Sequence, residues 1–149
     1  MKEVQWNNKS WEKLTKEETE EIFIIRSKVF VVEQNCVYQD IDNNDQKAIH
    51  VFGKKQNKII AYSRVFNEGE FFKETSFGRA LVDKKFRGKG IGSQLIKETL
   101  RIMKEKWPNK KIKISAQAHL SSLYKKHGFM SKGKEYLEDG IPHVAMYKN

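Results

Sequence analysis

Residues 76–93 read SFGRALVDKKFRGKGIGS, and a long amphipathic stretch ending near Trp107 follows them. The segment begins as a strand, passes through a loop with three glycines and leads directly into a helix. Such a loop leaves several backbone N–H groups bare beside the positive end of the helix dipole, where a diphosphate binds well. The segment therefore predicts a phosphate-bearing cofactor or substrate.

The glycine loop by itself leaves two interpretations open, a phosphate site and a tight structural turn. It is not a Walker loop, because no Gly-Lys-Ser/Thr follows at the required spacing, and it lacks the Gly-x-Gly-x-x-Gly spacing of dinucleotide-binding folds. The cations Arg87 and Lys89 lie next to its glycines, where they would neutralise phosphate charge. The choice between the two needs support from another part of the chain.

The composition is that of a globular protein. With 149 residues, 38% of them hydrophobic, we expect one folded unit over residues 1–149. Because the chain has no run of eighteen apolar residues and its first residues lack the apolar core of a signal peptide, we expect a cytoplasmic protein with no membrane partner. The single Cys36 excludes an internal disulfide and a CxxC zinc site, and we expect it to be a small buried hydrophobe.

The formal net charge of +10 favours an anionic partner, which is a nucleic acid, an acidic protein or a phosphorylated small molecule. The lysines do not form a block of five or six like charges, so most of them are expected on a solvated surface. The chain also lacks recognised nucleic-acid-binding motifs, which argues against a nucleic-acid partner. The four histidines have no close metal-ligand spacing, and we predict no metal.

The hydrophobic patterns predict a mixed α/β sandwich. A capping box at Thr15 opens a helix that ends near Val32. Further helices are expected over 91–107, ended by Pro108, and over 121–127, closed by Gly128. The expected strands are 4–11, 48–55, 58–66, 76–82, 111–118, 133–137 and 143–147, with a turn over 138–142 before the last of them.

The second half supplies the missing support for the phosphate site, because Tyr124 is followed by Gly128-Phe129. An Arg-x-x-Gly-x-Gly loop after a strand and a later Tyr-x-x-x-Gly-Phe resemble the GNAT superfamily of acyl-CoA-dependent acetyltransferases. The chain is similar in particular to the ElaA-like family. The segments that carry this similarity are VFVVEQ at 29–34, Asp42 with Asp45, His50, Gly78-Arg79, AQAHL at 116–120 and EDGIPH at 138–143.

The resemblance implies a fold and an activity. The fold is of the α+β type, with a central, mostly antiparallel, splayed sheet of about six or seven strands flanked by three or four helices. The activity is N-acetylation of a primary amine by direct attack on acetyl-CoA in a ternary complex. A catalytically silent acyl-CoA-binding sensor of the same fold stays open as the alternative, and a homodimer is compatible with the sequence.

The resemblance also assigns a cofactor site. The backbone of Leu81 and Val82 would pair with the pantetheine arm like an additional strand. Gln117 would line the junction between cofactor and acceptor, and Tyr124 would protonate the departing thiolate, although the alternative for Tyr124 is a helix residue that packs on the core. The amides that would hold the pyrophosphate belong to Arg87, Gly88, Lys89, Gly90, Ile91, Gly92 and Ser93.

The base that accepts the proton of the amine is not assigned by the resemblance. Many GNAT enzymes place a glutamate on the fourth strand, but here residues 77–82 contain none. The candidates for this base are Glu33, His119 and His143. For each of them, the alternative is a hydrogen-bonded structural residue. The residues expected around the acceptor are Glu33, Gln34, His50, Arg79, His119 and His143.

The acidic loop over 40–45 imitates the start of a calcium loop. It has Asp45 where such a loop needs glycine and Val51 where it needs the closing glutamate, so we predict no calcium. The resemblance suggests that this loop borders the acceptor site, where its carboxylates would attract an amine; a solvated loop is the alternative.

Overall fold

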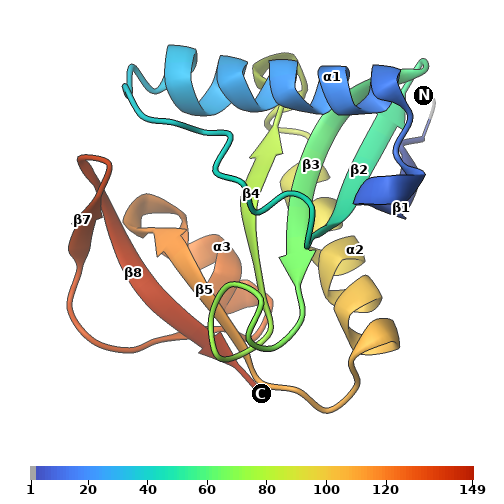
Figure 1. Cartoon of the computed structure of the whole chain (residues 1–149). Coiled ribbons are helices and arrows are strands. Elements are labelled where there is room, and N and C mark those ends of the chain that lie inside the picture. Colours follow the sequence, from blue (N-terminus) through green and yellow to red (C-terminus); the bar gives the residue numbers. More distant parts are fainter. Residues whose placement is uncertain (1–2) are drawn as a thin grey trace.

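The computed structural model describes residues 3–149, so the first two residues of the predicted unit lie outside it. Two antiparallel sheets form the framework (Figure 1). The first has the order β1-β2-β3-β4, with bounds Gln5–Ser10, Ile49–Lys55, Lys58–Phe66 and Ser76–Val82. The second has the order β5-β8-β6, and β7 also pairs with β8; the bounds of β5 to β8 are Ile112–Gln117, Met130–Ser131, Tyr136–Glu138 and Ile141–Lys148.

Helices cover both faces of the first sheet. Helix α1 (Lys16–Arg26) begins at the predicted capping box of Thr15 and continues as the wider π-helical turn η2 (Ser27–Glu33). It packs on the face that carries Phe52 and Tyr62. Helix α2 (Ile91–Lys106) packs on the opposite face, and the short α3 (Ser121–Lys126) lies beside the second sheet (Figure 1). None of the helices in residues 3–149 combines the length and apolar character that crossing a membrane requires.

The two sheets meet at β4 and β5, which run parallel but are joined at one end only. Thr75 and Ile112 form an isolated parallel bridge, and the Lys113 N–H donates to the Thr75 carbonyl at 2.9 Å. Beyond this point the structure has no ladder between the two strands, and they belong to separate sheets. The splayed sheet expected from the sequence is thereby confirmed, and the gap lies beside the second half of β4.

A bulge in β4 lies next to this gap. Tyr62 pairs with Leu81, and Arg64 pairs with Gly78. Two residues of β4, Arg79 and Ala80, therefore lie opposite one residue of β3, Ser63. Arg79 has φ of +50°, the left-handed conformation that an inserted residue can adopt in a bulge. Because a bulge bends its strand, it helps β4 to turn away from β5.

The C-terminal hairpin differs from the sequence-based expectation. Its turn consists of Asp139 and Gly140 alone, with φ of +52° and +78°, whereas a turn over 138–142 was expected. Two positive-φ residues match the right-handed twist of the flanking strands, which brings Glu138 and Ile141 into register. The predicted strand 133–137 is therefore shorter and later, as β7, and β6 is an additional strand that the prediction missed.

Candidate active site

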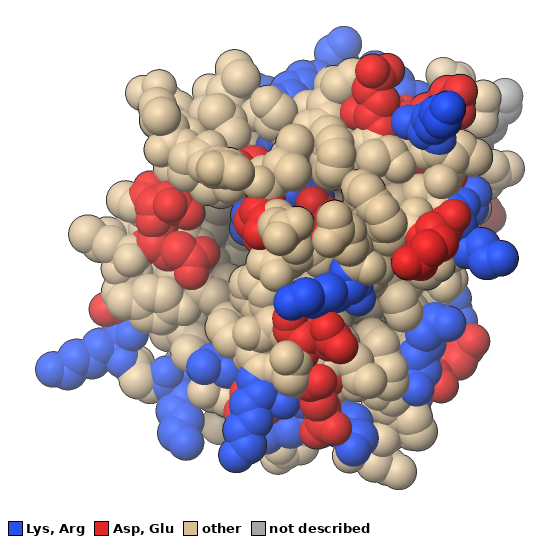
Figure 2. Space-filling view, in the orientation of Figure 1, with Lys and Arg blue, Asp and Glu red and all other residues tan. Residues whose placement is uncertain are grey.

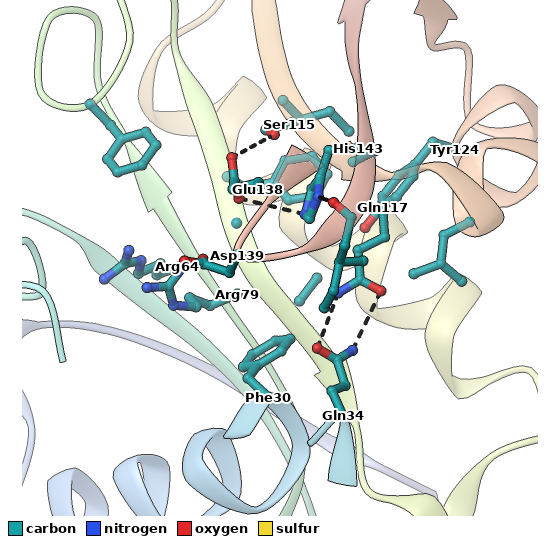
Figure 3. Close-up of a pocket in the computed structure, with 18 of the residues that line it drawn as sticks. Phe30, Gln34, Arg64, Arg79, Ser115, Gln117, Tyr124, Glu138, Asp139 and His143 are labelled. Carbon is teal, nitrogen blue, oxygen red and sulfur yellow. Dashed lines mark hydrogen bonds and ion pairs between the residues drawn. The ribbon is translucent and has the colours of Figure 1, made fainter. Parts of the chain in front are cut away.

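A pocket with a volume of about 120 Å³ lies in the gap between the two sheets (Figure 3). Residues 77–80 of β4 and residues 114–117 of β5 form its walls. Phe30 and Gln34, from η2 and its end, close one side, and residues of the β7–β8 hairpin close the other. The pocket therefore lies where the sheet opens, between segments that are distant in sequence.

The predicted phosphate loop lies at the start of α2. Gly90 occupies the N-cap position with φ of +79° and provides no side-chain cap, so the first N–H groups of the helix have no partner within it. Gly88 also has φ of +79°, and both glycines are exposed. A Cβ at either position would meet nothing within 4 Å, so the backbone conformation, rather than crowding within the protein, favours glycine here.

The remaining loop residues take up positions around this open helix end. The Ile91 side chain is buried in the core, and the Ser93 hydroxyl is hydrogen-bonded to His127 Nε2 at 2.9 Å, so both residues would offer a ligand their backbone N–H. Lys89 is exposed, with its ammonium above the Phe86 ring, and Gly92 packs near Val82. The arrangement suits the anion site that the sequence predicts.

Arg87 connects the loop to two other elements. Its Nε donates to the Val82 carbonyl at 2.9 Å, and its Nη1 and Nη2 donate to the Glu33 carboxylate at 2.6 and 3.1 Å. Glu33, one of the predicted bases, therefore lies beside the anion loop and does not line the pocket. His119 is exposed on the η4 turn (Ala118–Leu120) and does not line the pocket either.

Only one of the two residues predicted to pair with pantetheine has a suitable backbone. The Asp83 N–H donates to the Ile60 carbonyl at 2.7 Å, so Asp83 faces β3. Since backbone groups alternate sides along a strand, those of Val82 point toward the gap and those of Leu81 point toward Tyr62. The Leu81 side chain is buried under α1. Leu81 is therefore a wrong prediction, whereas the backbone of Val82 faces the gap, where its carbonyl accepts from Arg87 Nε and its N–H points the same way.

Tyr124 lies at the pocket within an aromatic cluster. Its ring is 6.0 Å from Phe77 and 6.0 Å from Phe129, measured between centroids, and the residue is 7% exposed. Burial raises the pKa of the Tyr124 hydroxyl to about 12. The hydroxyl therefore stays protonated over the whole neutral and moderately alkaline range.

The two predicted glutamines meet across the pocket. Gln34 and Gln117 exchange hydrogen bonds in both directions at 3.4 Å, which links η2 to β5 (Figure 3). Arg79 also lines the pocket. Five of the residues named from the sequence therefore line one pocket: Gln34, Arg79, Gln117, Tyr124 and His143.

His50 is not at this place, which corrects its prediction as a substrate contact. Its side chain is fully buried, at 0% exposure. Its Nδ1 lies 2.6 Å from the Tyr62 hydroxyl and its Nε2 lies 2.9 Å from the Asp45 carbonyl. Burial lowers the pKa of His50, and both ring nitrogens are used, so the residue is a structural one.

The acidic loop is also corrected, because arginines neutralise its carboxylates. Arg26 binds Asp40 at 3.0 Å and Asp45 at 2.6 Å, and Arg64 binds Asp42 at 2.5 Å. Arg79 pairs with Asp40 at 2.8 Å. Although burial acts to raise it, hydrogen bonds from Arg64 hold the pKa of Asp42 far below its ordinary value. These carboxylates are therefore committed within the fold and are not available to attract an amine.

Several pocket residues were missed by the sequence analysis. Glu138 and Asp139 line the pocket from the hairpin, and Ser115 lines it from β5. Cys36 lines the pocket too and is partly exposed, with its Sγ 3.0 Å from the Asp139 carbonyl, so its expected burial is wrong. The Asp139-Gly140 dipeptide was the sequence signal that could have found Glu138 and Asp139. Asp-Gly is typical of a two-residue hairpin turn, which aligns the residues before and after it.

The comparisons with known proteins agree with this geometry. Residues 12–149 match the family model described as an acetyltransferase (GNAT) domain. The chain is 36% identical over 145 residues to protein ElaA of Escherichia coli K12, covering 96% of this chain and 95% of that protein. The chain belongs to the ElaA-like group of GNAT acetyltransferases.

Solved structures of GNAT proteins have the same fold as this chain. The crystal structure of E. coli ElaA has a TM-score of 0.93 at 34% identity, covering 99% of this chain and 100% of that one. An acyl-CoA N-acyltransferase from Pseudomonas aeruginosa has a TM-score of 0.94 at 32% identity, with the same coverage. A GNAT family acetyltransferase from Elizabethkingia anophelis, with acetyl-CoA bound, shares the fold at a TM-score of 0.65 and 18% identity, over 97% of each chain. The α+β fold expected from the sequence is confirmed.

Proposed function

We propose that this GNAT protein is a cytoplasmic N-acetyltransferase that transfers the acetyl group of acetyl-CoA to a primary amine. The observation that carries the proposal is the pocket in the gap between β4 and β5, combined with the uncapped N-terminus of α2, the helix that follows β4 in the chain. A diphosphate at the helix end and an extended arm along Val82 would direct a thioester toward Tyr124. The family and the acetyl-CoA-bound relative support this assignment.

Direct attack in a ternary complex suits the pocket. In the described pocket, both side chains that could act as a covalent nucleophile already have partners on the β7–β8 hairpin: Cys36 contacts the Asp139 carbonyl, and Ser115 is hydrogen-bonded to Tyr136 and Glu138. The amine nitrogen would therefore form the new C–N bond itself while the C–S bond breaks. The amine must first lose a proton, which at pH 7 costs an ordinary alkylamine about 4 to 5 kcal/mol.

Tyr124 acts on the departing sulfur in this proposal. A phenol of pKa about 12 is a weaker acid than a thiol near 8.5, so complete proton transfer would be uphill by roughly 5 kcal/mol. We therefore assign to Tyr124 a hydrogen bond donated to the developing thiolate. This role replaces the outright protonation expected from the sequence.

Replacing Tyr124 by phenylalanine tests this role. We expect kcat to fall about tenfold to a hundredfold, because the donor to the sulfur is lost while the packing of the ring is kept. The KM for acetyl-CoA and the melting temperature should change little. Tyr147→Phe is the matched control, since that tyrosine lies on β8 away from the pocket lining. An unchanged kcat in Tyr124→Phe would remove the residue from the mechanism.

The function itself is tested by binding and turnover. Acetyl-CoA at a hundredfold excess over its dissociation constant should stabilise the folded protein by about 2.7 kcal/mol, measured as a rise in melting temperature. A panel of primary amines should then release free thiol from acetyl-CoA. Binding without release on any amine would favour the silent sensor, and the absence of binding would contradict both.

A further inference from the structure

Two pocket residues on the β7–β8 hairpin face each other across its tight turn. Glu138 Oε2 lies 3.5 Å from His143 Nε2, and both residues line the pocket (Figure 3). His143 is the register partner of Gln117 on β5, which places the pair next to the side chains that surround the proposed thioester. GNAT enzymes with a glutamate on the fourth strand do not need such a pair, but this chain lacks that glutamate.

The hydrogen bonds of His143 determine which nitrogen is free. Its Nδ1 lies 2.7 Å from the Ile141 carbonyl, which can only accept, so Nδ1 carries a hydrogen. In the neutral ring, Nε2 therefore presents a lone pair toward the Glu138 carboxylate. Two acceptors then face each other without a donor between them, an arrangement that a cationic N–H group would complete.

Neighbouring side chains hold Glu138 in this position. Ser115 Oγ donates to Glu138 Oε1 at 3.1 Å, and Ser115 is in turn hydrogen-bonded to the Tyr136 hydroxyl. The Tyr136 ring stacks on His143, with 6.2 Å between centroids. One carboxylate oxygen is therefore occupied by Ser115, and the other remains directed at His143, with the Glu138 side chain 46% exposed.

The charges around the pocket favour a cation there, although the whole chain carries +10. Arg64 and Arg79 line the pocket but are paired with aspartates of the 40–45 loop. Among the described pocket residues, Glu138 and Asp139 are the carboxylates without a lysine or arginine partner. Figure 2 shows acidic atoms over the hairpin side of the molecule, whereas lysine and arginine gather along the lower edge. The other titratable groups that line the pocket are those of Cys36, Tyr38 and Tyr124, and Tyr136 stacks on His143.

We propose that Glu138 Oε2 and His143 Nε2 together form the site that binds and deprotonates the ammonium group of the acceptor. This inference rests on the proposed function and names the acceptor as a cationic primary amine. One ammonium proton passes to His143 Nε2, and Glu138 stabilises the resulting imidazolium. The electron pair freed on nitrogen forms the C–N bond, and the electron pair of the C–S bond leaves with sulfur as a thiolate. The nitrogen then loses its second proton, which neutralises the thiolate.

The decisive variant is Glu138→Gln, with Glu135→Gln as its matched control. Glu135 precedes β7, is exposed and does not line the pocket. We expect Glu138→Gln to raise the KM for the amine tenfold or more and to lower kcat/KM for the amine about thirtyfold, with the KM for acetyl-CoA and the melting temperature unchanged. Glu138→Asp should recover part of the loss, and Glu135→Gln should behave as wild type.

His143→Gln separates proton removal from binding. Without the imidazole, the reaction must wait for amine that is already neutral, so its rate should rise about tenfold per pH unit below the pKa of the amine. The wild-type rate should rise less steeply over the same range. A Glu138→Gln enzyme with wild-type kcat/KM for amines, or a His143→Gln enzyme with the wild-type pH profile, would overturn the inference.

A binding experiment distinguishes failure of this inference from failure of the proposed function. Butylamine and butan-1-ol are titrated calorimetrically into the full chain saturated with CoA. The inference expects butylamine alone to bind, and its affinity to fall tenfold or more in Glu138→Gln. Equal binding of both compounds, or no effect of the variant, contradicts the ammonium site. Amine binding that depends on Glu138 without acetylation of any amine contradicts the proposed function only.

Discussion

Replacing Gly90 by aspartate is expected to weaken acetyl-CoA binding about a thousandfold. Gly90 is the N-cap of α2, has φ of +79° and borders the uncapped N–H groups proposed to hold the diphosphate. Aspartate tolerates positive φ better than most residues, so the loop should keep its conformation. A carboxylate about 4 Å from a phosphate oxygen costs about 4 kcal/mol at an effective dielectric constant of 20, which corresponds to roughly a thousandfold in affinity.

Two controls isolate the charge in this experiment. Gly90→Asn has nearly the same shape without the charge, and it should keep the affinity within about tenfold of wild type. Gly133→Asp introduces the same carboxylate at another exposed glycine with φ of +88°, in the loop before β7, and it should leave the affinity unchanged. Calorimetric titration with acetyl-CoA measures all three variants. If Gly90→Asn and Gly90→Asp lost affinity equally, backbone conformation rather than an anion site would explain the glycine.

Replacing Arg26 by methionine is expected to lower the free energy of unfolding by about 3 to 5 kcal/mol. The Arg26 side chain is 0% exposed and binds two buried aspartates, Asp40 and Asp45. Removing one member of a buried ion network leaves a charge that the remaining partners do not balance, and such losses are large. Within residues 3–149, one oxygen of Asp45 has no hydrogen-bond partner, and the other is bound by Arg26 and Arg64, so the loss of Arg26 leaves this carboxylate with a single cation.

An exposed ion pair provides the control for Arg26. Arg101 pairs with Glu98 and Glu105 on the surface of α2 and is 55% exposed, so Arg101→Met should cost less than about 1 kcal/mol. Urea unfolding at pH 7 measures both variants. If Arg26→Met were as stable as Arg101→Met, the buried network would not be what holds the 40–45 loop against the sheet.

The glycine loop before α2 and most of the helices and strands were accessible from the sequence because they depend on local patterns. Glycine spacing determines where the backbone can adopt positive φ, and the periods of apolar residues indicate helices and strands. Thr15, Gly90 and Gly128 were therefore placed correctly at helix ends. The resemblance to GNAT proteins then indicated the splay between β4 and β5, which periodicity does not reveal.

The acidic loop and His50 were misjudged because their partners are distant in sequence. Arg26, Arg64 and Arg79 come from α1, β3 and β4, and they meet the loop only after the sheet has formed. Nothing near Asp42 in the sequence shows that a buried arginine binds it. Polar residues in a loop are indistinguishable, by sequence pattern alone, from polar residues that form a buried ion network.

The sequence by itself determined most of the helices and strands, the position of the glycine loop and the family, since each depends on residues that are neighbours along the chain. The tertiary structure decided which side chains share the pocket. Glu33 turned to Arg87, His50 was buried against Tyr62, and Glu138 was brought beside His143 by a two-residue turn. These contacts depend on packing, because the burial and pairing of charged groups are properties of the assembled sheets and not of any single segment.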